Sequence, residues 1–179
     1  MKPYFLVLHN KIRFLLMKIT HKQLTVSGFQ LLSRNIKLVF SKKASVELGD
    51  KIINDGRFVA IVSDNATLKI GKNVYFNENV MISCHEKVII GDGCQFGPNV
   101  MVFDNNHRFS ASCGVTTDYK SAPICIGEHC WIGANVVILK GTTVGKNSVI
   151  GAGCIVSGNI PECSVVTQDR ALHIEMMRK

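Results

Sequence analysis

The sequence lacks several features that would assign it to common classes of protein. No apolar run near the N-terminus approaches the ~20 residues that span a bilayer, because the longest there covers only residues 4–8. No small-residue cleavage site follows that run, which argues against a secretory signal. The seven cysteines form no CxxC pair and are odd in number, which argues against a disulfide framework or a zinc knuckle. These absences predict one cytoplasmic domain within 179 residues.

Acidic residues are missing from the first quarter of the chain. Residues 1–45 contain nine Lys and Arg and no Asp or Glu, whereas residues 46–179 contain twelve bases and thirteen acids. Such a basic block suits nucleic acid, an anionic membrane or an anionic substrate, and a solvated basic face is the plain alternative. No P-loop, GxGxxG or nucleic-acid motif accompanies it, so we expect no nucleic-acid partner.

A period of six residues organises the middle and the end of the chain. From Ile126 the sequence reads IGEHCW, IGANVV, ILKGTT, VGKNSV, IGAGCI and VSGNIP. The same phase appears as IGKNVY, FNENVM, ISCHEK from Ile70 and as IGDGCQ, FGPNVM from Ile90. This period fits neither an amphipathic helix nor a half-buried strand. It predicts a triangular solenoid in which three hexapeptides make one coil of about 18 residues, with the leading aliphatic residues stacked inside.

The spacing of equivalent aliphatic residues shows where the coils are interrupted. Ile126 and Val144 are 18 residues apart, which is one clean coil. Ile70 lies 22 residues after Leu48 and 20 residues before Ile90, so those coils carry short insertions. Ile90 and Ile126 are 36 residues apart, and the excess falls at about residues 104–123, which are rich in turn formers. A long loop in an otherwise strict solenoid is usually functional.

Before residue 46 the six-residue pattern fades and a helical one replaces it. Apolar residues recur there at helical spacing, namely Phe5, Leu8, Ile12, Leu15, Leu16 and Ile19. We expect an amphipathic helix that caps the open end of the solenoid or lies on a membrane surface. The predicted domains are residues 1–45 with the helix and irregular capping strands, residues 46–161 with the β-helix and its inserted loop, and a tail at 162–179.

The repeats and the inserted loop together resemble the hexapeptide-repeat acyltransferases of the left-handed β-helix class. CWIGANVVILKGTTVGKNSVIGAGCIVSGNIP is similar to that family's most recognisable stretch, and DNNHRF is similar to the His-bearing segment of its sugar and polysaccharide O-acetyltransferases. The resemblance covers about residues 46–161. It implies an all-β, left-handed parallel β-helix, a homotrimer with active sites between subunits, acetyl-CoA as co-substrate and no metal. The implied activity is O-acetylation of a saccharide hydroxyl, on a bacterial surface polysaccharide or its precursor.

Acyl transfer to a hydroxyl requires a base, and His107 at the root of the loop is the candidate. The resemblance matches His107 with the family's catalytic His and matches Trp131 with a Trp that acts beside it. It matches Asn79 with an Asn that contacts the His or the acceptor, and we also assign Asp104 and Arg108 to substrate binding. Each of these residues also has an ordinary structural explanation. His107 would then be an exposed loop residue and Trp131 an aromatic residue packed at a corner of the coil. Asn79 would be a corner residue and Asp104 a turn former. Oxyanion donors are expected among the backbone amides of residues 131–134.

Small residues in two consecutive coils match positions that line the family's CoA groove. These residues are Gly133, Ala134, Gly151 and Ala152. Their small side chains permit close approach of the pantetheine arm, although the corners of the coil favour Gly in any case. Gly158 stands where relatives carry a Lys that faces the nucleotide phosphates. Lys146 is therefore added to the predicted cofactor set, with Lys140 and Arg170 as alternatives.

Other functions are compatible with the same scaffold. Within the transferases, N-acetylation of an amino-sugar nucleotide or O-acetylation of serine is the alternative. His85, His107 and His129 are spaced by 22 residues, and three His with a water form a catalytic zinc set. The HxxxxH pair of carbonic-anhydrase-like relatives is absent, however. A non-enzymatic scaffold, or a binder of anionic membrane or glycan through residues 1–45, would bind no CoA.

Overall fold

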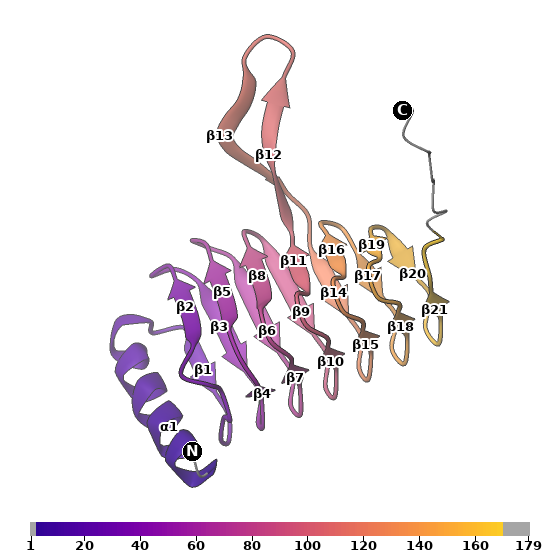
Figure 1. Cartoon of the computed structure of the whole chain (residues 1–179). Coiled ribbons are helices and arrows are strands. Elements are labelled where there is room, and N and C mark those ends of the chain that lie inside the picture. The colour runs from indigo at the N-terminus through magenta and orange to yellow at the C-terminus, as the bar shows by residue number, and fades with distance from the viewer. Residues whose placement is uncertain (1–2, 170–179) are drawn as a thin grey trace, which may run out of the picture.

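Three parallel sheets form the sides of a triangular coil in this computed structural model, which describes residues 3–169 (Figure 1). Sheet A contains β1 (Leu24–Val26), β3 (Ser45–Leu48), β6 (Thr67–Ile70), β9 (Lys87–Ile90), β14 (Ile124–Ile126), β17 (Thr143–Val144) and β20 (Asn159–Ile160). Sheet B contains β4 (Ile53–Asn54), β7 (Tyr75–Phe76), β10 (Gln95–Phe96), β15 (Trp131–Ile132), β18 (Val149–Ile150) and β21 (Val165–Val166). Sheet C contains β2 (Ile36–Phe40), β5 (Phe58–Val62), β8 (Val80–Cys84), β11 (Met101–Phe103), β16 (Val137–Leu139) and β19 (Ile155–Val156).

From β3 onward, the chain visits the sheets in the order A, B, C in successive coils. We name the edges of the coil after the sheets that they join: A/B, B/C and C/A. The register confirms the predicted stacking, because in sheet A Leu48 pairs with Ile70, Ile70 with Ile90, Ile90 with Ile126 and Ile126 with Val144. Each of these aliphatic residues is buried inside the coil, so the hydrophobic effect holds the stack in register.

The long interruption of the repeat is an antiparallel hairpin that rises from the C/A edge (Figure 1). It consists of β12 (Asn105–Ser110) and β13 (Gly114–Ser121) and follows β11 directly. Almost all of its side chains are exposed or only half-buried. The extruded loop is therefore confirmed, and it has a regular structure of its own.

The predicted N-terminal helix is also confirmed. Helix α1 (Pro3–Thr20) lies against the N-terminal end of the coil (Figure 1). The buried Phe14 packs into the hydrophobic core, and the Asn10 side-chain amide donates a 2.8 Å hydrogen bond to the Leu32 carbonyl. Among residues 3–169, no helix is long and apolar enough to cross a membrane.

The division of the chain at residues 45 and 161 stays a prediction. The parallel ladders already begin at Leu24, where β1 pairs with β3. At the other end, the last pairing of sheet B involves Val165 and Val166. Residues 170–179 of the predicted tail, including Arg170, lie outside the described residues.

Candidate active site

His107 lies in β12, on the hairpin, where its backbone pairs with that of Tyr119 in β13. The pairing shifts register between His107 and Phe109. Such an irregularity changes the direction in which nearby side chains point and is common beside active sites. The hairpin thus holds an exposed imidazole beside the C/A edge of the coil.

Contacts from the second strand of the hairpin hold the imidazole in place. Nδ1 of His107 lies 3.1 Å from the carbonyl oxygen of Thr116. The Tyr119 ring packs against the His107 imidazole, with 4.4 Å between the ring centroids. The same tyrosine ring also packs against the His85 ring, with 4.1 Å between the centroids. A carbonyl can only accept a hydrogen bond, so Nδ1 carries the hydrogen in this contact. The neutral ring then presents an unprotonated Nε2.

Asp104 is fully buried at the base of the hairpin, and its carboxylate bonds to the backbone of the turn after β8. One oxygen accepts from the His85 amide and the other from the Glu86 and Lys87 amides, each at 2.8 Å. The Asn105 side chain adds a fourth hydrogen bond, at 3.0 Å. The structure therefore places Asp104 as an anchor of the hairpin, and its assignment to substrate binding stays a prediction.

The same carboxylate affects a buried thiol. Burial raises the pKa of Cys84 from 9.0 to about 12, and the negative charge of Asp104 adds to the effect. The thiol donates a hydrogen bond to the Thr67 carbonyl at 3.3 Å. Cys84 is thus a protonated core residue at neutral pH, as expected for a structural cysteine.

The hairpin separates two open cavities, and His107 lines both. The larger, of about 610 Å³, is also lined by Arg108, Lys120, Lys140 and Asp118. The other, of about 530 Å³, contains the rings of His85, Tyr119 and Phe103. Arg108 donates from Nε to the Tyr119 carbonyl at 3.3 Å, which leaves its terminal nitrogens available to a ligand.

Trp131 and Asn79 lie elsewhere on the same chain. Trp131 is 57% exposed in β15, on the outer face of sheet B, which is the side of the triangle opposite the C/A edge. Asn79 lies at the B/C edge with a positive φ of 60°. Its amide donates to Asn99 at 2.9 Å, and Asn99 donates to Asn135 at 3.0 Å, so Asn79 belongs to a ladder of corner residues. Within one chain, neither residue lies on the side of the coil that bears His107.

The four small residues of the predicted CoA groove occupy the B/C edge. A Cβ on Gly133 would come within 2.7 Å of the Ala152 nitrogen, so close stacking of the coils requires glycine there. The amides of Trp131 and Gly133 donate to the Ser148 and Ile150 carbonyls at 2.9 and 2.8 Å. These two amides hold the coil together, and the expectation of oxyanion donors among the amides of residues 131–134 stays a prediction.

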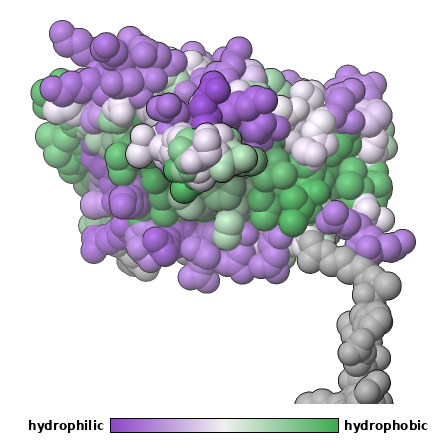
Figure 2. All heavy atoms as spheres, turned by 90° about the horizontal axis from the view of Figure 1, so that it is seen from above, coloured by the Kyte–Doolittle hydropathy of each residue, from purple (hydrophilic) through white to green (hydrophobic). Residues whose placement is uncertain are grey.

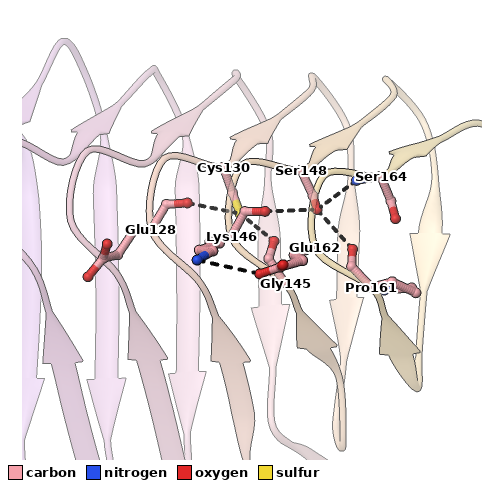
Figure 3. Close-up of polar contacts among 8 residues, drawn as sticks. All are labelled: Glu128, Cys130, Gly145, Lys146, Ser148, Pro161, Glu162 and Ser164. Carbon is pink, nitrogen blue, oxygen red and sulfur yellow. Dashed lines mark hydrogen bonds and ion pairs between the residues drawn. The ribbon is translucent and has the colours of Figure 1, made fainter.

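Lys146 lies at a different edge, A/B, and pairs with Glu162 at 3.6 Å (Figure 3). The pair is exposed, and its strength is therefore small. Figure 3 also shows how small polar side chains hold successive coils at this edge: Ser148 Oγ donates to the Pro161 carbonyl and accepts from the Ser164 amide. The predicted cofactor residues thus divide between two edges of the coil.

The three His residues of the zinc alternative do not converge. His85 and His107 both stack on Tyr119, whereas His129 forms a corner of the A/B edge. Among residues 3–169, no group of three His, Cys, Asp or Glu side chains is placed to hold a metal.

Sequence reasoning missed Thr116 and Tyr119, which position the imidazole. The sequence predicts only a long inserted loop here, because the segment lacks the six-residue period. The β-branched run at residues 115–117, directly after Gly114, is a signal typical of a hairpin and could have indicated the second strand.

Comparisons with known proteins agree with this architecture. The family described as hexapeptide repeat of succinyl-transferase matches residues 123–157. Galactoside O-acetyltransferase of Escherichia coli (strain K12) is 41% identical over 55% of this chain and 49% of its own length. The putative lipopolysaccharide biosynthesis O-acetyl transferase WbbJ of the same strain is 29% identical over 85% of this chain and 79% of its own.

A solved structure shows the same fold. The hexapeptide-repeat-containing acetyltransferase of Vibrio cholerae O1 biovar eltor, complexed with acetyl coenzyme A, has a TM-score of 0.58 and 21% identity, covering 87% of this chain and 71% of that one. The predicted left-handed parallel β-helix is thereby confirmed. The chain spans about half the length of several curated relatives that it matches.

Proposed function

We propose that this chain, which belongs to the hexapeptide-repeat acetyltransferases, transfers an acetyl group from acetyl-CoA to a saccharide hydroxyl. The observation that carries the proposal is the contact between His107 Nδ1 and the Thr116 carbonyl, which leaves Nε2 as a base on an exposed arm. The names of the relatives support the reaction class, and DNNHRF supports a sugar acceptor. The cations Arg108, Lys120 and Lys140 beside His107 suit precursors that carry anionic groups.

In the proposed reaction, Nε2 of His107 takes the proton of the acceptor hydroxyl as its oxygen attacks the thioester carbonyl. The carbon–sulfur bond breaks when the tetrahedral intermediate collapses. The imidazolium then returns the proton to the sulfur of CoA. The stacked Tyr119 ring keeps the imidazole in one orientation throughout, which preserves the alignment that direct transfer requires.

We also propose that the site is completed by a neighbouring subunit in a homotrimer. His107 rises from the C/A edge, whereas Trp131 and the small residues of the predicted CoA groove lie on sheet B and at the B/C edge. Sheet C is the side that joins these two edges. If sheet C of each of three chains faces a common axis, the C/A edge of one chain meets the B/C edge of the next.

The outer face of sheet C is suited to such contact. Its outward residues form two largely apolar rows along the coil. One row contains Val39, Ile61, Phe103 and Leu139 and is interrupted by Ser83; the other begins at Lys37 and continues through Met81, Met101, Val137 and Ile155. The outer face of sheet A carries charges instead, such as the Glu47–Lys69 pair at 3.1 Å. Figure 2 looks onto the hairpin and shows hydrophobic residues gathered beside its base. Exposed apolar patches of this kind mark interfaces.

We place the reaction in the cytoplasm, where acetyl-CoA is made. The thiols support this assignment, since all seven cysteines are free, as is usual in a reducing compartment.

The test is release of free thiol from acetyl-CoA in the presence of a panel of neutral sugars, uronic acids, sugar nucleotides, amino sugars and serine. His107→Ala should lower kcat about a hundredfold or more, because the base is lost, while CoA binding persists. His129→Asn is the matched control, since it removes an exposed His from another edge. Full turnover in the His107→Ala variant contradicts the role of His107. Acceptor-dependent release with amino sugars or serine alone would favour the N-acetyl or serine alternative.

A further inference from the structure

Helix α1 exposes a continuous apolar stripe on the side that faces away from the coil. The residues of this outward stripe are each between 51% and 73% exposed, and they are Phe5, Leu8, Ile12, Leu15, Leu16 and Ile19. Their spacing of three and four places them on one face of the helix. Single exposed apolar residues are ordinary, but a contiguous set of this size marks a surface that is covered in use.

The stripe does not attach the helix to the rest of the protein, because another face already does so. Phe14 is 3% exposed and Asn10 is fully buried, and the Asn10 amide bonds to the carbonyls of Leu32 and Gln30. Just after the C-terminal end of the helix, His21 Nε2 lies 2.6 Å from the Phe40 carbonyl oxygen in β2. The inner face is therefore fixed to the coil, and the outward stripe is available for a partner.

Charge indicates which partner fits. Lys11 and Lys18 are both exposed and lie seven residues apart, two turns along the border between the inner face and the outward stripe. Neither has a carboxylate partner among the described residues. No Asp or Glu occurs anywhere in residues 1–45, which carry nine Lys and Arg. An apolar stripe bordered by cations alone is complementary to a surface that is apolar below and anionic above.

We propose that the outward stripe of α1 docks on an anionic lipid surface, with Lys11 and Lys18 at the level of the headgroups. The helix would lie in the plane of the interface, its apolar side chains at the boundary of the acyl chains. The long lysine side chains can reach up to the phosphates from the border of the stripe. A helix that already rests on its own coil through the opposite face attaches the whole enzyme to the membrane without crossing it.

The test is co-sedimentation of the full chain with vesicles of phosphatidylcholine alone or mixed with phosphatidylglycerol. We expect binding to the anionic vesicles, weakened by salt. The double variant Leu15→Asp/Ile19→Asp should lower binding by at least about tenfold. Lys11→Gln and Lys18→Gln should each lower it by about fivefold, the factor expected for one lysine near an anionic surface. Val165→Asp is the control for the apolar substitutions, because Val165 is 73% exposed, as Ile19 is, but lies on sheet B. Lys87→Gln is the control for the lysine substitutions.

Several results would overturn the proposal. They are equal binding to neutral and anionic vesicles, no binding to either, or wild-type binding by the Leu15/Ile19 variant. A smaller oligomer for that variant in sedimentation velocity, without vesicle binding by the wild type, would assign the stripe to a second copy of the chain. Thiol release with a soluble acceptor should be unchanged in the double variant, so that docking and catalysis fail independently.

Discussion

Replacing Asp104 with alanine should loosen the base of the hairpin that carries His107. The substitution removes the acceptor of three backbone hydrogen bonds, each 2.8 Å long, from the amides of His85, Glu86 and Lys87. A hydrogen bond to a charged group contributes about 1.5–3 kcal/mol. Glu86 and Lys87 are exposed, so water replaces part of what is lost. We therefore expect a local destabilisation of about 2–4 kcal/mol.

Native-state hydrogen exchange at the three amides measures this quantity directly. It reports local opening, and it does not require that a coil with many repeats, or an oligomer, unfold in one step. A loss of about 2–4 kcal/mol corresponds to exchange that is roughly 30 to 1,000 times faster at residues 85–87. Asp104→Asn keeps one carbonyl oxygen, so it should give about half the change in free energy.

Asp118→Ala is the matched control. Asp118 is an exposed carboxylate on β13 of the same hairpin, and removing it should change the stability of the turn by less than about 0.5 kcal/mol. If exchange at residues 85–87 in Asp104→Ala matched that of the wild type, the carboxylate would not anchor the hairpin, and the assignment made from the hydrogen bonds would be refuted.

Three further predictions concern other parts of the molecule. Tyr119→Leu should lower kcat about tenfold with little change in KM, whereas Tyr119→Phe keeps the stacked ring and should stay near wild type; equal kinetics for both would remove the positioning role. Burial raises the pKa of Cys84 to about 12, so the folded state keeps the proton that the unfolded thiol releases above pH 9. Stability should therefore fall as the pH rises from 9 to 12, and the fall should be shallower in Cys84→Ala, as chemical denaturation would measure. Gly133→Ala should shift the unfolding midpoint downward by a measurable amount, since its Cβ would lie 2.7 Å from the Ala152 nitrogen; an unchanged midpoint would show that the coils can separate at this edge.

The stacking of the coil could be predicted from the sequence because it depends on a local rule. Each hexapeptide turns the chain by one corner and directs one aliphatic side chain inward. Counting between such residues therefore predicted that Ile90 stacks on Ile126 in spite of the hairpin between them, and the register confirms it. The N-terminal helix followed equally from a local pattern of apolar residues.

Roles at the candidate site could be predicted only in part. The position of His107 at the root of an interruption was visible in the sequence, because an insertion in a strict repeat has to leave the coil. The contacts with Thr116 and Tyr119 were not, since they arise from pairing across the hairpin. Asp104 illustrates the difference: three residues before His107, it bonds to the amides of the preceding coil, about 18 residues away in the chain.

The sequence by itself determined the architecture of this protein, its register, and the place where the hairpin leaves the coil, because each depends on a repeat of neighbouring residues. Only the tertiary structure decided that His107, Trp131 and Lys146 lie at different places around the triangle. Which corner a residue occupies depends on the phase of the whole coil. In the proposed trimer, which residues meet depends on which outer face is apolar. The tertiary structure likewise decided that α1 packs through Phe14 and Asn10 and turns the stripe from Phe5 to Ile19 outward, because both faces of this helix are largely apolar and only one can contact the coil.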